Sequence, residues 1–195
     1  MDTLLEKRRQ LLHLIIGVVL IFTIYFNIMS KQILLFLTLM SIALSLIHTK
    51  IKIPIISWLL EKFERKHTHK LLPGQGFILF LIGALFPFYI LSKNYALASL
   101  TILTVGDSIA PLAGIYLGKI KLPFNKSKKL EGLFAGTFSS FLFSMIFIAP
   151  LQALLTSMIS MAIESLKLKI GSISIDDNLL IPVTASTILL IILSF

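Results

Sequence analysis

Residues Ala96–Leu117 read ALASLTILTVGDSIAPLAGIYL, an apolar run of membrane-spanning length with one ionisable side chain, Asp107, near its middle. Six more apolar runs occur along the chain, at Leu11–Ile28, Gln32–Ile47, Phe77–Leu91, Leu133–Ala149, Leu151–Leu166 and Leu179–Phe195. Several are shorter than the roughly 20 residues of a full span, as expected for broken helices or helices packed inside protein. The sequence therefore predicts an all-α, polytopic membrane bundle of about seven spans, folded as a single domain over residues 1–195.

The overall composition excludes several other classes of protein. Of the 195 residues, 56% are hydrophobic and 14% are charged, and there is no cysteine. Soluble domains contain about 45–50% apolar and about 25% charged residues. The chain is therefore not a soluble globular enzyme, a disordered segment or a disulfide-stapled secreted domain.

The basic residues alternate between the connecting segments. Sixteen of the eighteen Lys and Arg lie before Leu11, in His48–Lys70, in Lys119–Lys129 or just after Leu166, and the other two are Lys31 and Lys93. By the positive-inside rule, the N-terminus and these basic segments are cytoplasmic. The net charge of +9 is thus explained by membrane topology, and no nucleic-acid partner is expected.

The segment His48–Lys70 is not a span. Its apolar residues recur at helical spacing from Ile55 to Phe63, with charged residues on the opposite face and Trp58 as an interfacial anchor. This pattern predicts a cytoplasmic amphipathic helix on the inner leaflet. A surface helix docked on the bundle is the alternative, and the two are compatible.

Asp107 is the leading candidate for chemistry, because an ionisable residue deep in a span is costly. Gly106 precedes it and Pro111 follows four residues later, so the helix is predicted to break near the acid. Such a break would open Asp107 to a water-filled cavity on the cytoplasmic side. The alternative is an aspartate paired with Lys or Arg for structure alone.

The next loop, Lys119–Lys129, contains five lysines in eleven residues and leads into another apolar run. Ammonium groups together with free N–H groups at a helix start form an anion site. Glu131 and Gly132 follow at the mouth of that run, and carboxylates among lysines suit a magnesium polyphosphate. The alternative is that these lysines only set topology or bind anionic lipid.

Three weaker signals lie at the edges of the apolar runs. The Lys70–Gly76 segment carries two glycines that let backbone approach a ligand or simply form a turn. Arg9 and His13, four residues apart, share a helical face, although a histidine there is typical of a membrane interface. Glu164 and the Asp176–Asn178 segment flank the last loop, where the acids would cap a helix or hold a metal.

Five stretches form an ordered pattern: Arg9-Gln-Leu-Leu-His13, Pro73-Gly-Gln-Gly76, Gly106-Asp107 with Gly114, the Lys/Ser-rich stretch ending in Glu131-Gly132, and Asp177-Asn178. Together they resemble the CTP-dependent lipid kinases, which include dolichol, phytol and farnesol kinases and CTP-dependent diacylglycerol kinases. That family is related in fold to the CDP-diacylglycerol synthases. The chain departs from the family pattern at Gln10, where lysine is usual, and at Lys129, where Ser or Thr is usual.

The resemblance implies Mg²⁺-dependent transfer of the CTP γ-phosphoryl group to the hydroxyl of a membrane lipid alcohol, of polyprenol, dolichol or diacylglycerol type, at the cytoplasmic face. Asp107 would be a metal ligand or the base for the hydroxyl, Glu131 and Asp177 further metal ligands, and Arg9 and His13 would line the lipid-hydroxyl side. The implied nucleotide-binding residues are Gly74, Gly76, Gly106, Ser108, Gly114, Gly118, Lys126, Ser127, Lys128, Lys129 and Gly132.

Two other functions stay open on the sequence. A cytidylyltransferase also uses CTP, but it joins the nucleotide to a lipid phosphate and releases pyrophosphate. A small transporter or membrane scaffold is the non-enzymatic alternative, disfavoured because no inverted repeat relates the halves and a scaffold needs no intramembrane acid. Assembly as a homo-oligomer and the identity of the lipid alcohol are also open.

Overall fold

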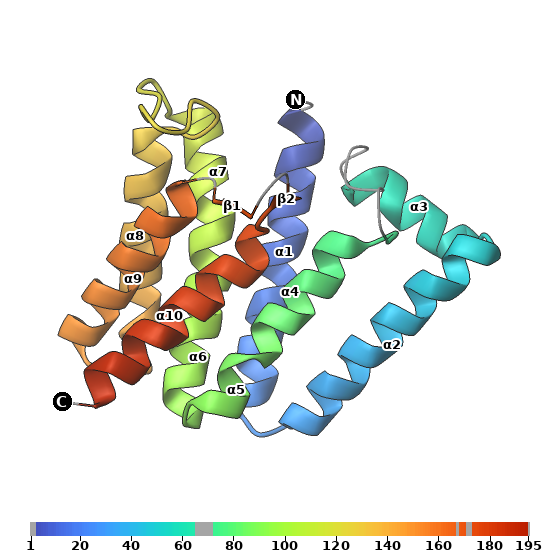
Figure 1. The fold of residues 1–195 in the computed structure, drawn as a ribbon, viewed down its shortest axis with the longest axis horizontal. Helices are drawn as coiled ribbons and strands as arrows, with labels where there is room; N and C mark the ends of the chain where they lie inside the picture. Colours follow the sequence, from blue (N-terminus) through green and yellow to red (C-terminus); the bar gives the residue numbers. More distant parts are fainter. Residues whose placement is uncertain (1–2, 65–71, 167, 171–172, 195) are drawn as a thin grey trace.

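The computed structural model describes residues 3–64, 72–166, 168–170 and 173–194, and the predicted all-α class is confirmed (Figure 1). With continuous segments counted together, the described residues form eight helices. They are α1 (Thr3–Tyr25), α2 (Lys31–Lys50), α3 (Pro54–Phe63), α4 with α5 (Gln75–Leu85, Pro87–Ile90), α6 with η1 and α7 (Lys93–Thr101, Ile102–Gly106, Asp107–Tyr116), α8 (Leu130–Ser144), α9 (Pro150–Ser165) and α10 (Asp177–Leu193). A two-residue antiparallel hairpin, β1 (Lys169–Ile170) and β2 (Ile173–Ser174), precedes α10.

Three of the described helices are long and apolar enough to cross a membrane: α1, α2 and the 24-residue α6–η1–α7 helix. The prediction of about seven spans is therefore corrected. The helices α8 and α9 have 15 and 16 residues, and at 1.5 Å per residue they reach about 24 Å, short of a hydrocarbon core of about 30 Å. The run Leu133–Ala149 also includes turn residues beyond Ser144, whereas the runs Phe77–Leu91, Leu151–Leu166 and Leu179–Phe195 match their helices in length to within one residue and are themselves too short for a full span.

The connecting segments sort to the two ends of the bundle (Figure 1). The N-terminus, α3, the α7–α8 loop and the β1–β2 hairpin lie at one end, whereas the α1–α2 turn, α5 and the C-terminus lie at the other. The described parts of the four basic segments thus share one end, as the alternation of Lys and Arg predicts. We call this the basic end.

The helix α3 lies at the basic end and begins at Pro54, whose fixed φ and missing N–H suit a first helical turn. None of its residues is buried. Ile55, Trp58 and Leu59 lie on one face and are exposed, Ile55 by 72%. The helix is shorter than the predicted His48–Lys70 segment, because His48 and Lys50 belong to α2 and residues 65–70 lie outside the described part of the chain.

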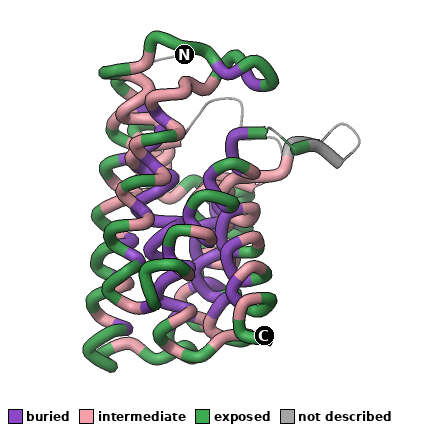
Figure 2. Tube along the Cα trace, turned by 90° about the vertical axis from the view of Figure 1, so that its left-hand side faces the viewer, coloured by how far each residue is buried: buried purple, intermediate pink, exposed green. Residues whose placement is uncertain are grey.

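The α6–η1–α7 helix forms the centre of the bundle. In its apolar window 72% of residues are buried, against 22% in α1 and in α2. Figure 2 shows the buried residues gathered inside the bundle, with exposed residues along the outer helices. Asp107, at the start of α7, is consequently surrounded by protein.

The central helix packs on α8 through small residues. The buried face of α8 consists of residues spaced by four, which are Gly132, Gly136, Ser140 and Ser144. A Cβ atom added at Gly136 would lie 2.7 Å from Ala110 Cβ and 3.1 Å from the Gly106 carbonyl oxygen. Small residues at this spacing let two helix backbones approach closely, as in membrane helix pairs.

We expect the substitution Gly136→Ala to lower the free energy of unfolding by about 1–3 kcal/mol, because the added methyl overpacks a rigid contact. Gly76→Ala is the matched control, since nothing lies within 4 Å of its added Cβ, and it should be neutral or stabilising by up to about 1 kcal/mol. Thermal or denaturant unfolding in detergent measures both. Equal behaviour of the two variants would contradict the close α7–α8 contact.

Candidate functional site

Asp107 follows a π-helical turn. The segment η1, Ile102–Gly106, has π-type hydrogen bonding inside an otherwise α-helical span, and such insertions are frequent at functional sites. The predicted break near Asp107 is therefore a local change of helical winding within a continuous helix. Asp107 is 5% exposed, and its Oδ2 lies 3.8 Å from Nε2 of His13 on α1.

Three acids from three helices meet next to this turn. Oxygens of Asp107 on α7, Glu164 on α9 and Asp177 on α10 all lie within 4.8 Å of one another. Asp107 and Glu164 are buried, and Asp177 is partly buried. Carboxylate oxygens in such a group repel one another unless a cation lies between them. We call these residues the acid cluster.

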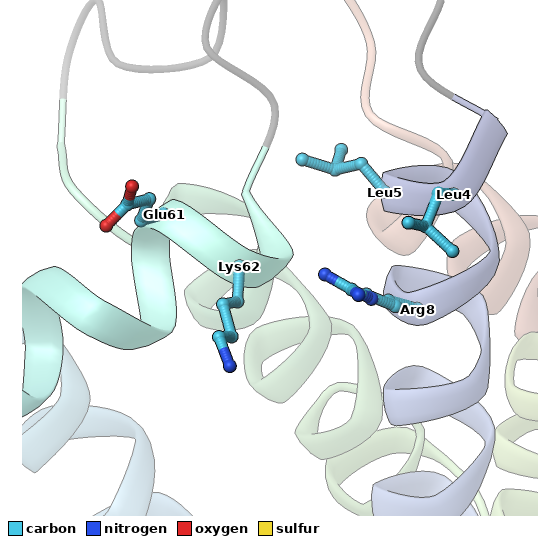
Figure 3. Close-up of a pocket in the computed structure, with 5 residues that line it drawn as sticks. All are labelled: Leu4, Leu5, Arg8, Glu61 and Lys62. Atoms are coloured by element: carbon cyan, nitrogen blue, oxygen red, sulfur yellow. The ribbon is translucent and has the colours of Figure 1, made fainter.

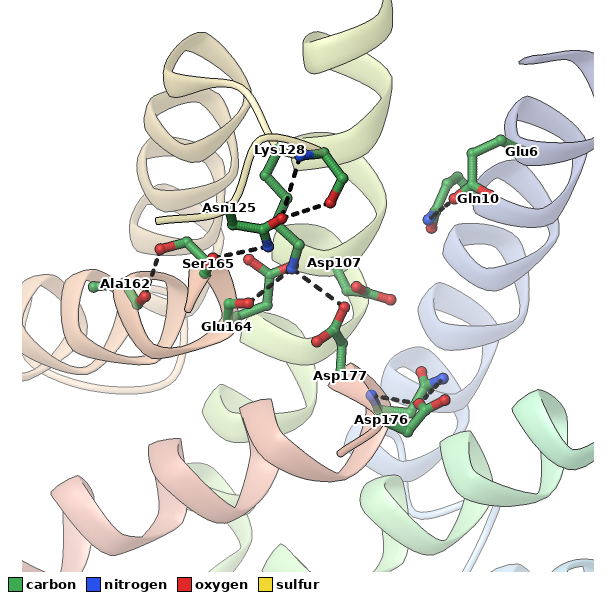
Figure 4. A network of polar contacts seen from close by, with 12 residues as sticks. Glu6, Gln10, Asp107, Asn125, Lys128, Ala162, Glu164, Ser165, Asp176 and Asp177 are labelled. Atoms are coloured by element: carbon green, nitrogen blue, oxygen red, sulfur yellow. Dashed lines mark hydrogen bonds and ion pairs between the residues drawn. The ribbon is translucent and has the colours of Figure 1, made fainter. Parts of the chain in front are cut away.

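Lys128 provides a cation for the acid cluster (Figure 4). Its Nζ donates to the Glu164 carboxylate, to the Glu164 carbonyl oxygen at 2.8 Å and to Asp177 Oδ2 at 3.3 Å. Burial alone lowers the pKa of Lys128, but the charges of Glu164 and Asp177 raise it by more, so it lies above the ordinary lysine value. Lys128 is therefore a charged ammonium group at neutral pH.

The α7–α8 loop is folded so that Lys128 points inward. Asn125 is buried, and its Nδ2 donates to the Ser165 carbonyl oxygen at 3.0 Å. Leu122 N donates to the Lys128 carbonyl oxygen at 3.1 Å, which closes the loop on itself. Lys126 and Ser127, also predicted to contact nucleotide, are exposed on this loop. Of the predicted loop residues, the structure brings only Lys128 to the acid cluster.

Glu131, predicted as a metal ligand, is engaged elsewhere. Its Oε1 accepts hydrogen bonds from Lys119 N at 2.9 Å and Ile120 N at 3.0 Å, at the other end of the loop. Backbone N–H groups, including its own, lower the pKa of Glu131. The structure therefore gives Glu131 a loop-capping role, and Glu164 takes the third place in the acid cluster.

The predicted nucleotide-binding glycines between η1 and α8 lie in crowded surroundings. A Cβ atom added at Gly106 would lie 2.6 Å from Met161 Sδ. A Cβ added at Gly118 would lie 2.3 Å from the Gly114 carbonyl oxygen, and one added at Gly132 would lie 2.4 Å from the Ala110 carbonyl oxygen. Around Gly114 and Gly118 the side chain of Lys129 packs closely. Ser108 is buried, and its Oγ has no hydrogen-bond partner among the described residues.

The Pro73–Gly76 segment is held at the start of α10. Gly74 has φ of +76°, a conformation that favours glycine, and its N–H donates to both carboxylate oxygens of Glu64. Asn178 Nδ2 lies 3.5 Å from the Gly76 carbonyl oxygen. Asp176 caps α10 by accepting a hydrogen bond from Asn178 N at 3.0 Å, which confirms the predicted helix cap. Its neighbour Asp177 joins the acid cluster. Gly76 is thus near the start of α10, whereas Gly74 is held by Glu64.

Arg9 and His13 form a second polar group on α1. Glu6 accepts from Arg9 at 2.7 Å and from Gln10 at 2.8 Å, and Glu6 and Gln10 are buried. The His13 ring packs on Phe80 of α4 with centroids 4.4 Å apart. His13 thus lies on α1 between Phe80 and Asp107, 3.8 Å from the Asp107 carboxylate and without a hydrogen bond to it.

A pocket of about 320 Å³ lies between the start of α1 and α3 (Figure 3). It is lined by Leu4, Leu5, Arg8, Glu61 and Lys62. None of the acid cluster lines it. This pocket and the acid cluster are therefore separate features of the basic end.

Glu164 was considered in the sequence as a helix cap or a metal carboxylate, but it was not included among the predicted site residues. The signal that could have found it is the rule that pointed to Asp107, because Glu164 is an acid at the end of the apolar run LQALLTSMISMAIES. Asn125 and Glu6 had no comparable signal. Their roles depend on contacts with Ser165 and Arg9 that only the folded chain shows.

A scan of protein-family models, a search of curated proteins and a search of solved structures found no match to this chain. The site is therefore interpreted from its own chemistry.

We expect Glu131→Gln to speed amide hydrogen exchange at Lys119 and Ile120, because a neutral amide is a weaker acceptor than a carboxylate. In the wild type, protection of these amides should be full at neutral pH and fall as the pH drops below the ordinary glutamate pKa of 4.5, since the folded pKa is lowered. Exchange mass spectrometry, corrected for intrinsic rates, measures both effects.

The same variant decides between a loop cap and a metal ligand. Stabilisation of the protein by Mg²⁺ added together with pyrophosphate should be unchanged in Glu131→Gln and reduced in Asp177→Asn. An equal loss of this stabilisation in the two variants would indicate that Glu131 is a metal ligand.

Proposed function

We propose that this chain is an integral-membrane phosphotransferase that moves the γ-phosphoryl group of CTP to the hydroxyl of a membrane lipid alcohol. The observation that carries the proposal is the acid cluster with its buried Lys128, held at the basic end of an apolar bundle. The motif resemblance to CTP-dependent lipid kinases supplies the nucleotide and the acceptor class.

The donor set of the acid cluster fits a magnesium ion. Asp107, Glu164 and Asp177 offer carboxylate oxygens, the ligands that hard divalent cations prefer, and they contribute no sulfur or imidazole atom. A bound Mg²⁺ supplies neutralisation of the charge on the transferring phosphoryl group. These three residues would hold it, with Lys128 positioned to hold a phosphate oxygen.

Phosphoryl transfer suits a site of this kind because it needs positioning and charge neutralisation more than covalent chemistry by the protein. In the reaction, the lipid hydroxyl oxygen bonds to the γ-phosphorus, the bond to the β–γ bridging oxygen breaks, and CDP leaves. In this proposal the hydroxyl proton passes to Nε2 of His13, which has no hydrogen-bond partner among the described residues. Lys128 neutralises charge on the phosphates, and His13, beside Asp107, lies on the side that the proposal gives to the hydroxyl.

The lipid acceptor is supported by the outer surface of the bundle. The apolar helices α1 and α2 are only 22% buried in their spanning windows, and their exposed side chains are large and apolar. Exposed aromatic residues, such as Phe22 and Phe36, belong to this surface. A lipid alcohol in the bilayer is therefore in direct contact with the protein, and its hydroxyl lies at membrane-surface depth.

We further propose that the basic end is cytoplasmic, with the exposed apolar face of α3 on the inner leaflet. Trp58 is the only tryptophan in the chain and is 51% exposed on that face. Its fluorescence should therefore be quenched by lipids brominated high on the acyl chain. Quenching by aqueous iodide in place of brominated lipid would contradict this placement.

The function is tested with purified protein, CTP labelled at the γ-phosphate, Mg²⁺ and a panel of lipid alcohols. We expect labelled lipid phosphate and CDP. Release of pyrophosphate with a CDP-lipid would instead indicate a cytidylyltransferase, and the absence of any CTP-dependent product would contradict the proposal.

Within that assay, Asp107→Asn and Glu164→Gln should each lower turnover by at least about a hundredfold, because each removes one charge from a preorganised site. Glu61→Gln is the matched control for Glu164→Gln, since Glu61 is exposed on α3. Full turnover in Glu164→Gln would remove the acid cluster from the reaction.

A further inference from the structure

We infer that the Lys128 ammonium occupies the cation position of the acid cluster, so that a divalent metal and a polyphosphate bind together and the metal alone binds weakly. This inference rests on the proposed function, since it concerns how the same acids receive their metal. It adds to that function a thermodynamic coupling between metal binding and polyphosphate binding, which the three acids alone would not produce.

The geometry places Lys128 where a metal would have to bind. Its Nζ contacts the carboxylates of Glu164 and Asp177, two of the three acids, at the same time. The Lys128 side chain is 27% exposed, so part of the ammonium's hydration is replaced by these oxygens. A metal bound by the same two carboxylates would compete with the ammonium for Glu164 Oε1 and Asp177 Oδ2.

Two cations do not share this space without cost. Unit charges a few ångströms apart in a partly buried site repel by several kcal/mol. Metal entry therefore requires that Lys128 leave Glu164 and Asp177. Once it has left the carboxylates, the Lys128 ammonium remains in a poorly hydrated site, and this is unfavourable unless it contacts an anion.

The lysine side chain is able to make this move while its loop stays in place. Asn125 ties the loop to Ser165, and Glu131 caps it at Lys119 and Ile120, so the backbone around Lys128 is fixed. The side chain itself has a flexible four-carbon stem, and lysine binds phosphate as a point charge. A phosphate group beside the metal would thus accept Lys128 as it leaves the acids.

The thermodynamic consequence is reciprocal. If a polyphosphate strengthens metal binding by some factor, the metal must strengthen polyphosphate binding by the same factor. Lys128 then offsets part of the charge of the acids in the resting protein, and a metal offsets it in the loaded one. The acid cluster thus faces a cation in both states.

The test measures Mn²⁺ binding to the purified full chain by electron paramagnetic resonance, at free Mn²⁺ concentrations fixed by a metal buffer. In the wild type, inorganic pyrophosphate should tighten Mn²⁺ binding at least about tenfold, the effect of one moderate ionic contact. No change on adding pyrophosphate, or tight Mn²⁺ binding without it, would overturn the inference. This test compares Mn²⁺ binding to the wild-type protein with and without pyrophosphate, so it does not depend on any variant folding.

The variant Lys128→Met removes the resident cation and keeps much of the side-chain volume. Mn²⁺ alone should bind it at least about tenfold more tightly than it binds the wild type, and pyrophosphate should add little. Lys121→Met is the matched control, because Lys121 is an exposed lysine of the same loop, and it should behave as the wild type. Weaker Mn²⁺ binding in folded Lys128→Met would show that Lys128 supports the metal rather than competing with it.

The inference and the proposed function fail separately. Coupled binding of Mn²⁺ and pyrophosphate with no phosphorylated lipid would leave the inference in place and remove the function. Lipid phosphorylation by a protein that binds Mn²⁺ tightly without pyrophosphate would do the reverse.

Discussion

The ionic contacts of Lys128 with Glu164 and Asp177 hold together parts of the chain that are far apart in sequence. They join the α7–α8 loop to the end of α9 and the start of α10. Carboxylates buried among apolar helices are costly unless a cation compensates them. Because Asp107 and Glu164 are buried, the α7–α8 loop has to position Lys128 beside them. The hydrogen bonds of Asn125 and Glu131 hold the loop in that position.

Close packing of small residues makes the site compatible with an apolar bundle. The four-residue spacing of glycine and serine along α8 brings it against α7, directly beside the turn that carries Asp107. The π-helical segment η1 adds a local irregularity without ending the central helix. Polar chemistry is thereby concentrated at the basic end, while the rest of the bundle offers apolar surface to lipid.

The sequence allowed prediction of the features that follow from periodicity and local charge. The helical class, the shared end of the basic segments, the separate helix α3 and the capping acid Asp176 are of this kind. The number of spans was not predictable from apolar runs, because a short apolar helix packed inside the bundle has the same hydropathy as part of a span, as for α9 and α10. The partners of Lys128 and Glu131 were also not predictable, since Lys128 lies on the α7–α8 loop and Glu131 in the first turn of α8, and the fold of the loop decides what each side chain contacts. Glycines such as Gly132 fitted both a ligand approach and a helix contact, and the structure shows the contact.

The proposed lipid phosphorylation needs a charged site to coexist with an apolar solvent. The acid cluster would meet this need, because it joins Lys128 of the α7–α8 loop at the basic end to Asp107 inside the central helix. The central claim is that Asp107, Glu164 and Asp177 hold a divalent metal while Lys128 moves to phosphate. The most direct measurement is anomalous diffraction from crystals grown with Mn²⁺ and a non-hydrolysable CTP analogue. The account predicts a manganese peak among the three carboxylates with the Lys128 ammonium on a phosphate oxygen, and a peak elsewhere, or Lys128 still on Glu164 beside a bound metal, would contradict it.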